Sequence, residues 1–227
     1  MKPKIIFFKL GLTSCYLIIG KENEIVLVDA GMPDKLKQFK KILSENGIDP
    51  AQIKLIVLTH SHFDHCGSAS QIRELTGAKI VVHELEKECV ESDKVLIPKG
   101  VTLKGKITKP IIFSMKFSFP TFTPDILVNQ NTYSLSKFGI EGQIVHTPGH
   151  TTGSLSVILD SGEAFVGCMA HNGFPFRKRP GLPIYAQDIE AVKESWNLLL
   201  EKGISQVYPG HGKPFPAEVI KKQLNDH

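Results

Sequence analysis

The stretch Leu58-Thr59-His60-Ser61-His62-Phe63-Asp64-His65-Cys66-Gly67 brings three imidazoles and a carboxylate into six consecutive positions. A segment of this length does not fold by itself, so this density of donor groups indicates a metal site. Neutral imidazole and carboxylate suit zinc, at about 2.0 to 2.2 Å, and also iron or manganese. The alternative is a polar loop that is rich in histidine by chance, but clustered imidazoles normally need a partner.

The residues on either side predict where this loop lies in the fold. The apolar run 53–58 is rich in β-branched side chains and predicts a buried strand. Small polar residues from Gly67 onward, followed by good helix formers up to Leu75, predict the start of a helix. The candidate ligands therefore lie on a strand-to-helix loop, where a rigid scaffold commonly presents functional groups.

Three further short motifs lie along the chain. One is a strand that ends in an Asp, Val26-Leu27-Val28-Asp29-Ala30-Gly31, and two are loops with a histidine, Pro148-Gly149-His150-Thr151-Thr152-Gly153-Ser154 and Tyr208-Pro209-Gly210-His211-Gly212. Together with the H-x-H-x-D-H stretch, they make the chain resemble the metallo-β-lactamase-fold hydrolases, particularly the glyoxalase II and lactonase-like members. The resemblance extends from about residue 14 to about residue 216. It implies an α+β fold of the four-layer αββα sandwich type, in a single domain over residues 1–227.

The resemblance also implies a ligand set. The first metal would be bound by His60, His62 and His150, and the second by Asp64, His65 and His211. One position departs from the family, because Cys168 stands where most members have a bridging Asp. A thiolate is a good zinc ligand, so we expect Cys168 to bind the second metal; the alternative is a buried inert thiol. Asp29 is expected to fix the ligand loop without touching substrate.

The implied reaction is the attack of a metal-bound hydroxide on an ester, thioester, lactone or lactam carbonyl. Two zinc ions per chain are expected, with iron or manganese as other possibilities. Asp64 is expected to orient the hydroxide as well as bind metal. Lactonase-like relatives place a Tyr about three residues beyond the acidic ligand that Cys168 replaces here, and His171 lies at that position. His171 is therefore expected to act as an oxyanion donor or general acid. Phe63 and Arg177 are the predicted substrate contacts, although the basic cluster 177–179 also fits a solvated loop.

Two other classes of function stay open. Persulfide-dioxygenase-like enzymes, which are oxidoreductases with one iron, keep the same H-x-H-x-D-H stretch. A non-catalytic metal-binding relative is disfavoured because every first-site ligand is present. A nuclease of this fold would be expected to carry an added nucleic-acid domain, for which this chain has no room.

Composition supports a soluble protein acting on a small molecule. The 227 residues are 41% hydrophobic and 22% charged, and the net charge of +4 is too small and scattered to favour a nucleic-acid partner. The four cysteines lack C-x-x-C spacing, which fits a reducing cytoplasm. Lys9 and Gly11 interrupt an apolar start that otherwise imitates a signal peptide, and no run approaches the roughly 20 apolar residues of a membrane span. A homodimer is possible.

Periodicity predicts the remaining elements. Strands are expected near 4–10, 14–19, 24–29, 79–82, 126–128, 132–135, 141–146, 154–159, 163–167 and 206–208, and helices near 33–46, from about 83, and over 187–202. His83 is expected to cap or pack. Residues 92–125 form an irregular apolar insertion in which Pro98, Pro110, Pro120 and Pro124 should break any long element. Its apolar residues, from Ile111 to Phe122, fit a lid or wall over the metal site, a dimer contact, or simple core.

Overall fold

The first of two large sheets comes almost entirely from the N-terminal half of the chain. The computed structural model describes residues 3–92, 94, 98–114, 118–129, 132–173 and 177–225. The strands of this sheet lie in the order β1 (Lys4–Leu10), β2 (Thr13–Ile19), β3 (Ile25–Val28), β4 (Ile53–Val57), β5 (Lys79–His83) and β7 (Ile126–Val128). Antiparallel pairing joins β1, β2 and β3, and parallel pairing continues from β3 to β7. All four side chains of β3 are buried, as expected for a strand covered on both faces.

The second sheet is built by the C-terminal half. Its strands are, in spatial order, β14 (Phe215–Pro216), β13 (Gln206–Gly212), β11 (Glu163–Asn172), β10 (Leu155–Leu159), β9 (Gly142–His146) and β8 (Thr132–Ser134). β11 and β13 are parallel, and the other neighbours are antiparallel. The helix α6 (Ile189–Glu201) forms the crossover between β11 and β13, and α7 (Glu218–Asn225) follows β14.

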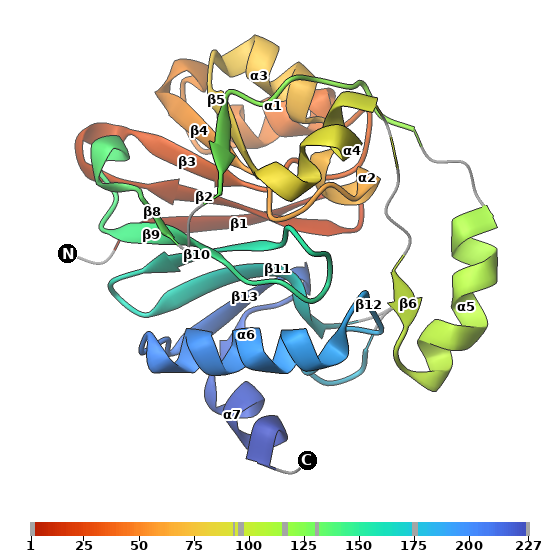
Figure 1. Cartoon of the computed structure of the whole chain (residues 1–227). Helices are drawn as coiled ribbons and strands as arrows, with labels where there is room; N and C mark the ends of the chain where they lie inside the picture. Colours follow the sequence, from red (N-terminus) through yellow and green to blue (C-terminus); the bar gives the residue numbers. More distant parts are fainter. Residues whose placement is uncertain are drawn as a thin grey trace.

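Three apolar cores hold four layers together. The first lies between the first sheet and the helices α1 (Leu36–Glu45), α3 (Ala69–Thr76) and α4 (Lys87–Ser92). The second lies between the two sheets, and the third lies between the second sheet and α6 and α7. Figure 1 shows the helices on the two outer sides and the sheets between them. The predicted α+β, four-layer αββα sandwich is therefore confirmed.

Most elements start and end within a few residues of their predicted positions. The short helix α2 (Phe63–Cys66) holds part of the histidine-rich stretch. In the described residues there are also 3-10 turns at Lys21–Asn23, Pro50–Gln52, Glu84–Glu86 and Ser136–Phe138. His83 caps one of them, because its Nδ1 accepts the backbone N–H of Leu85 at 3.2 Å. No helix in the described ranges combines the length and apolar character needed to cross a bilayer.

The insertion at 92–125 is more regular than expected. It contains β6 (Lys99–Gly100), which pairs with β12 (Tyr185–Ala186), and the helix α5 (Leu103–Ser114). The expectation that Pro110 breaks the helix is wrong: α5 continues through it, starting from a Thr102 side chain that accepts the N–H of Gly105 at 3.1 Å.

The apolar residues of this insertion do not all have the same environment. Phe119 and Phe122 are buried in the first core, so the core alternative is correct for these two. The side chains of residues 111–117 lie outside the described part of the chain. In contrast, Leu103 and Ile107 of α5 are exposed, and the lid, wall and dimer-contact expectations stay predictions.

Candidate metal centre

The fold brings the predicted ligands together from four segments that are far apart in the sequence. The chain leaves β4 at Val57, and the loop that follows and α2 provide His60, His62, Asp64 and His65. The loop after β9 provides His150, β11 provides Cys168, and β13 provides His211. Both sheets therefore contribute, which is why neither half of the chain could form this centre alone.

His60, His62 and His150 form the first cluster of donors. The Nδ1 atom of His62 lies 3.1 Å from Nε2 of His60 and 3.1 Å from Nε2 of His150. The three side chains are at most 8% exposed, and their three donor atoms lie within 4.8 Å of one another. This arrangement could hold one metal ion.

Asp64, His65 and His211 form a second cluster beside the first. The Nε2 atom of His211 lies 3.2 Å from Oδ2 of Asp64 and 3.3 Å from Nε2 of His65. Nε2 of His65 and Oδ2 of Asp64 are 3.7 Å apart. The set of two imidazoles and a carboxylate fits a second divalent ion.

Cys168 lies between the two clusters. Its Sγ is 3.2 Å from Nε2 of His65, and it can share an ion with His60 and His65 or with His171 and His211. The side chain is 5% exposed. Cys168 thus stands among donor atoms of both clusters, in the surroundings that a ligand requires; its role as a ligand stays a prediction.

Three of the histidine rings are held from behind by the protein. The Nδ1 atoms of His65, His150 and His211 lie 2.7 Å from Oδ2 of Asp29, 2.9 Å from the carbonyl of Tyr185 and 3.3 Å from the carbonyl of Leu12, respectively. A carbonyl only accepts, so His150 and His211 donate from Nδ1 and their Nε2 is the atom left to bind metal in the neutral ring. These partners fix both the tautomer and the direction of the rings.

Asp29 connects the rings of the two clusters. Its carboxylate accepts the backbone N–H of Thr59 at 2.8 Å and the Thr59 hydroxyl at 3.0 Å, in addition to the ring of His65. Because the Thr59 hydroxyl proton points at Asp29, its oxygen is left to accept Nδ1–H of His60 at 3.0 Å. Asp29 has a φ of 61°, in the left-handed region that Asp tolerates better than most residues. The position predicted to fix the ligand loop makes these contacts.

A glycine makes room for this network. Gly167 on β11 has a φ of 50°, and a Cβ added there would lie 2.3 Å from Oγ1 of Thr59. A side chain at this position would push Thr59 away from both Asp29 and His60. The close approach of β11 to the ligand loop therefore requires glycine.

The charges of the metal-free cluster are strongly coupled. Burial opposes ionisation of Asp64 and Cys168, but the neighbouring imidazoles, first of all that of His65, outweigh it and hold the pKa of both groups below its usual range. Burial also opposes a charged His211, yet Cys168 and Asp64 raise its pKa to about 9. Burial instead lowers the pKa of His62 to about 4 and that of His60 well below its usual range. The first cluster thus offers neutral imidazoles. The second offers an anionic carboxylate and thiolate, but the pKa values of His65 and His211 are raised, so these two rings must release a proton when a metal binds.

The other predicted site residues have more varied surroundings. His171 is 1% exposed, lies within the cluster formed with Cys168 and His211, and has its pKa lowered to about 4 by burial. Phe63 is partly buried and packs against the first core. Arg177 donates Nη1–H to the carbonyl of Leu182 at 2.8 Å, so part of its guanidinium orders its own loop. Substrate contact by Phe63 and Arg177 stays a prediction.

Sequence reasoning did not identify several residues that hold the ligands. Thr59 lies in the histidine-rich stretch 58–67, and its hydroxyl directly before His60 could have indicated a hydrogen bond to that ring. Tyr185 and Leu12 act through main-chain carbonyls, which leave no mark in the sequence. Glu86, at the end of a 3-10 turn, is 1% exposed and contacts Ser61 inside the ligand loop; no motif pointed to it.

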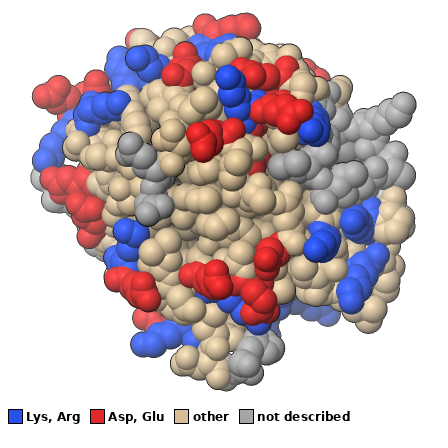
Figure 2. Space-filling view, viewed as in Figure 1, with Lys and Arg blue, Asp and Glu red and all other residues tan. Residues whose placement is uncertain are grey.

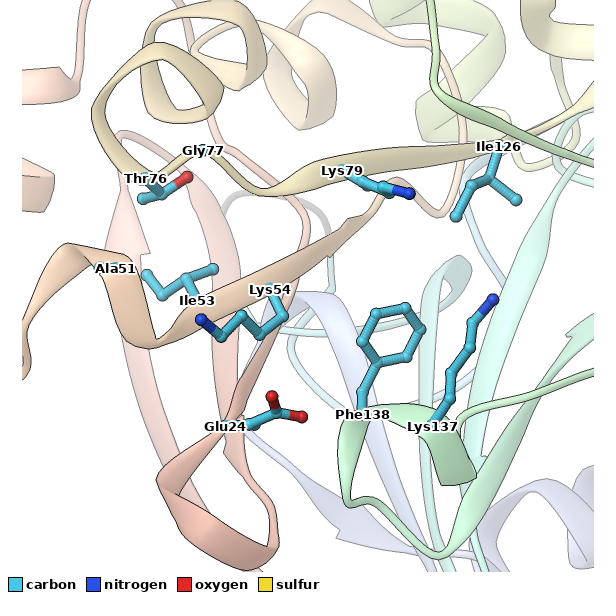
Figure 3. A pocket seen from close by; sticks show the side chains of 10 residues that line it. All are labelled: Glu24, Ala51, Ile53, Lys54, Thr76, Gly77, Lys79, Ile126, Lys137 and Phe138. Atoms are coloured by element: carbon cyan, nitrogen blue, oxygen red, sulfur yellow. The ribbon is translucent and has the colours of Figure 1, made fainter.

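A separate pocket of about 380 Å³ lies away from the candidate ligands. It is lined by the N-terminal ends of β4 and β5 and by residues of the 3-10 turn Ser136–Phe138, whereas the ligands follow the opposite end of β4. Figure 3 shows the side chains of Lys54, Lys79 and Lys137 and the ring of Phe138 around it. None of the candidate metal ligands lines this pocket.

Two sheets packed face to face between helices, with a histidine-rich centre formed by residues from both halves of the chain, define an αββα protein with a candidate metal centre. The chain belongs to the metallo-beta-lactamase superfamily, whose family model matches residues 9–211.

Relatives and solved structures agree with this assignment. The chain is 30% identical over 205 residues to a protein of Methanocaldococcus jannaschii named a probable metallo-hydrolase, covering 88% of each. It is 29% identical over 162 residues to the hydroxyacylglutathione hydrolase GloC of Haemophilus influenzae, covering 70% of this chain and 68% of that one.

Among solved structures, the BLEG-1 B3 metallo-beta-lactamase matches with a TM-score of 0.70 at 21% identity, covering 99% of this chain and 97% of that one. TTHA1623, in a di-iron-bound form, matches with a TM-score of 0.67 at 22% identity, covering 96% and 97%. At these identities the two structures show that the fold is shared.

Proposed function

We propose that the chain is a metallo-hydrolase with two metal ions, zinc in the first instance. His60, His62 and His150 would hold one ion, and Asp64, His65, Cys168 and His211 the other. The observation that carries this proposal is the pair of adjacent donor clusters, with the rings of His65, His150 and His211 held from behind so that the donor atoms converge. A structural zinc ion is usually closed by four protein ligands, whereas the first cluster offers three histidines. Iron is the alternative metal, because TTHA1623, which shares the fold, is described in a di-iron-bound form.

The protein's own groups would divide the work of hydrolysis. When bound, the metal ions supply a water molecule whose pKa is lowered towards about 7 and a Lewis acid for the substrate carbonyl. Asp64 keeps 18% of its side chain exposed among buried imidazoles, so its carboxylate can accept a hydrogen bond from the attacking water and orient it. Asp29 and Thr59 hold the histidines in place and do not reach substrate.

The substrate class is an ester, thioester, lactone or lactam. We place thioesters first in any screen, because one relative covering most of this chain is a hydroxyacylglutathione hydrolase. The face shown in Figure 2 has Lys and Arg interspersed with Asp and Glu, which favours a small molecule over a polyanion. These preferences define the order of testing.

The role of His171 follows from the same proposal. We expect His171 to donate a hydrogen bond to the developing oxyanion, or to act as a general acid. Its ring lies in one donor cluster with Cys168 and His211, so it could alternatively bind metal. His171→Ala should lower kcat by about 10²- to 10⁴-fold and leave the metal content unchanged. Loss of one metal ion from this variant would instead identify His171 as a ligand.

The test of the function is reconstitution of metal-free protein. Zinc, iron or manganese is added back separately, and hydrolysis of thioesters, lactones, esters and lactams is followed for each. The proposal predicts that activity returns with metal and is absent from Asp64→Asn at equal metal loading. Dioxygen uptake with a persulfide, confined to the iron form and without hydrolysis of any carbonyl substrate, would overturn it.

A further inference from the structure

Glu86 is a buried carboxylate outside every ligand motif. It ends the 3-10 turn Glu84–Glu86, which follows β5, and it is 1% exposed. An ionised group in such a place needs several hydrogen-bond donors, because burial of an uncompensated charge is costly. The structure gives it donors from two different loops.

One carboxylate oxygen is bound to the first ligand loop. Oε2 of Glu86 accepts the backbone N–H of Ser61 at 3.0 Å and also the Ser61 hydroxyl. Ser61 lies between His60 and His62, so the peptide held by Glu86 is the one that sets the spacing of these two ligands.

The other oxygen is bound to the loop that carries His150. Oε1 of Glu86 accepts the backbone N–H of Gly153 at 3.1 Å. Gly153 closes a tight turn after His150, in which the N–H of Thr151 donates to Oγ of Ser154 at 3.0 Å. A Cβ added at Gly153 would lie 2.6 Å from Cγ of Glu86, so this close approach also depends on glycine.

We propose that Glu86 is a positioning residue that clamps the His60–His62 loop of the first sheet to the His150 loop of the second, and so assembles the first metal site. The inference rests on the proposed function in that it takes these three histidines as metal ligands. The second cluster has its own supports, Asp29 behind His65 and the Leu12 carbonyl behind His211. The clamp therefore acts on one site and not on the other.

The carboxylate is chemically necessary for a clamp of this kind. Glu86 accepts from two loops at once, one through each oxygen. A glutamine of the same shape has one acceptor oxygen and one NH₂ group, which only donates. The NH₂ group would face the backbone N–H of either Ser61 or Gly153, so one of these two hydrogen bonds would be lost. Glu86→Gln should therefore release one loop with little change in side-chain volume.

The test is a metal titration of metal-free Glu86→Gln, using Co²⁺ so that the thiolate of Cys168 is seen through its charge-transfer band. We expect the Co²⁺ affinity of the first site to fall about 10- to 100-fold, which is the usual effect of replacing a residue that supports metal ligands. The thiolate band, which reports the second site, should form at the same Co²⁺ concentration as in the wild type. Saturating metal should restore turnover. Glu84→Gln, an exposed neighbour on the same turn, is the control and should titrate like the wild type.

Ser61→Ala tests the same clamp from the other side. It removes the hydroxyl contact with Glu86 and keeps the N–H contact, so metal affinity at the first site should fall several-fold. If Glu86→Gln does not fold, Ser61→Ala provides the test. Unchanged binding at the first site, or equal loss at both sites, overturns the clamp. A wild type that binds two ions without hydrolysing any carbonyl substrate would sink the proposed function alone, and one that binds no metal would sink both.

Discussion

Asp29 illustrates at the scale of a single residue how the centre is ordered before metal arrives. Its carboxylate contacts Thr59 and His65, and through Thr59 it reaches His60. A left-handed backbone conformation like that of Asp29 costs on the order of 1–3 kcal/mol in a residue other than glycine. Residues in such conformations are often found at functional sites. One buried carboxylate thus orients one histidine from each cluster.

Replacing Asp29 with asparagine isolates the carboxylate from the backbone. Asparagine tolerates the left-handed region equally well, so Asp29→Asn should fold. Its amide has one oxygen, however, and can accept from Thr59 or from His65 but not from both. We expect metal affinity to fall about 10- to 100-fold, with the ion held by His65 lost first; competition with a chromophoric chelator measures it. Asp34→Asn is the matched control, because Asp34 also has a φ of 61° and is exposed. Equal behaviour of the two variants would contradict the assigned role.

The candidate ligands were predictable at this scale because the chain resembles a known family whose motifs name the ligand positions. Motifs such as Pro148–Ser154 and Tyr208–Gly212 matched that family, and strand periodicity alone would not have shown which side chains meet. The carbonyls of Leu12 and Tyr185 were not predictable, since any residue supplies a carbonyl and only the fold decides which one faces a histidine. Glu86 was missed for a related reason, because a buried and an exposed glutamate look alike in sequence.

At the scale of elements, α5 is the part of the structure that differs most from expectation. Four prolines in 92–125 predicted an irregular segment, yet Leu103–Ser114 is helical through Pro110. A proline in a helix interior removes one hydrogen bond, but the residues on both sides of Pro110 remain helical. In Figure 1, α5 lies beside the sandwich, next to β6 and β12. Strands, by contrast, were predicted well because buried β-branched runs have few alternatives.

A hydrogen bond between the hydroxyls of Thr108 and Tyr185 attaches α5 near the metal centre. The same residue, Tyr185, accepts from His150 through its main-chain carbonyl. Tyr185→Phe removes the first contact and keeps the second. We therefore expect hydrogen exchange to become about 5-fold faster over residues 103–110, corresponding to about 1 kcal/mol, with metal content unchanged. Loss of metal from this variant would show that α5 supports the His150 loop more directly.

At the scale of the whole molecule, three apolar cores stabilise the sandwich, and residues from both of its sheets and the loops after them form the polar centre. The sandwich itself was predicted from ordered motifs and not from periodicity, which alone indicates only strands and helices. Burial in this packing shifts the pKa values of the polar groups in the centre. In the metal-free protein the free energy of unfolding therefore depends on pH.

The pKa values of His62 and His171, both lowered to about 4 by burial, set the direction of this dependence. In the unfolded chain a histidine has a pKa near 6.5, so between about pH 6.5 and 4 the unfolded state binds more protons. The stability contributed by these neutral rings is present above pH 6.5 and lost as the pH falls towards 4, on the order of 3 kcal/mol from each. The raised pKa of His211 affects only the alkaline side, where its contribution is lost as the pH rises through about 9.

Urea denaturation of the metal-free protein across this acid range measures the effect. His171→Gln removes one of the buried histidines whose pKa is lowered, so its unfolding free energy should fall less steeply with acid than that of the wild type. Identical slopes for the two proteins, or a wild type whose stability does not change between neutral pH and about pH 5, would contradict the burial of neutral histidines.

Elemental analysis of protein purified without added metal, wild type beside Cys168→Ser, tests the dinuclear centre most directly. The account predicts about two metal ions per chain in the wild type, falling towards one in the variant, because the thiolate is lost from the second site only. About one ion per chain, unaffected by the substitution at Cys168, would contradict a dinuclear site with a thiolate ligand. If that ion were iron, the result would favour oxygen chemistry over carbonyl hydrolysis as the function of the protein.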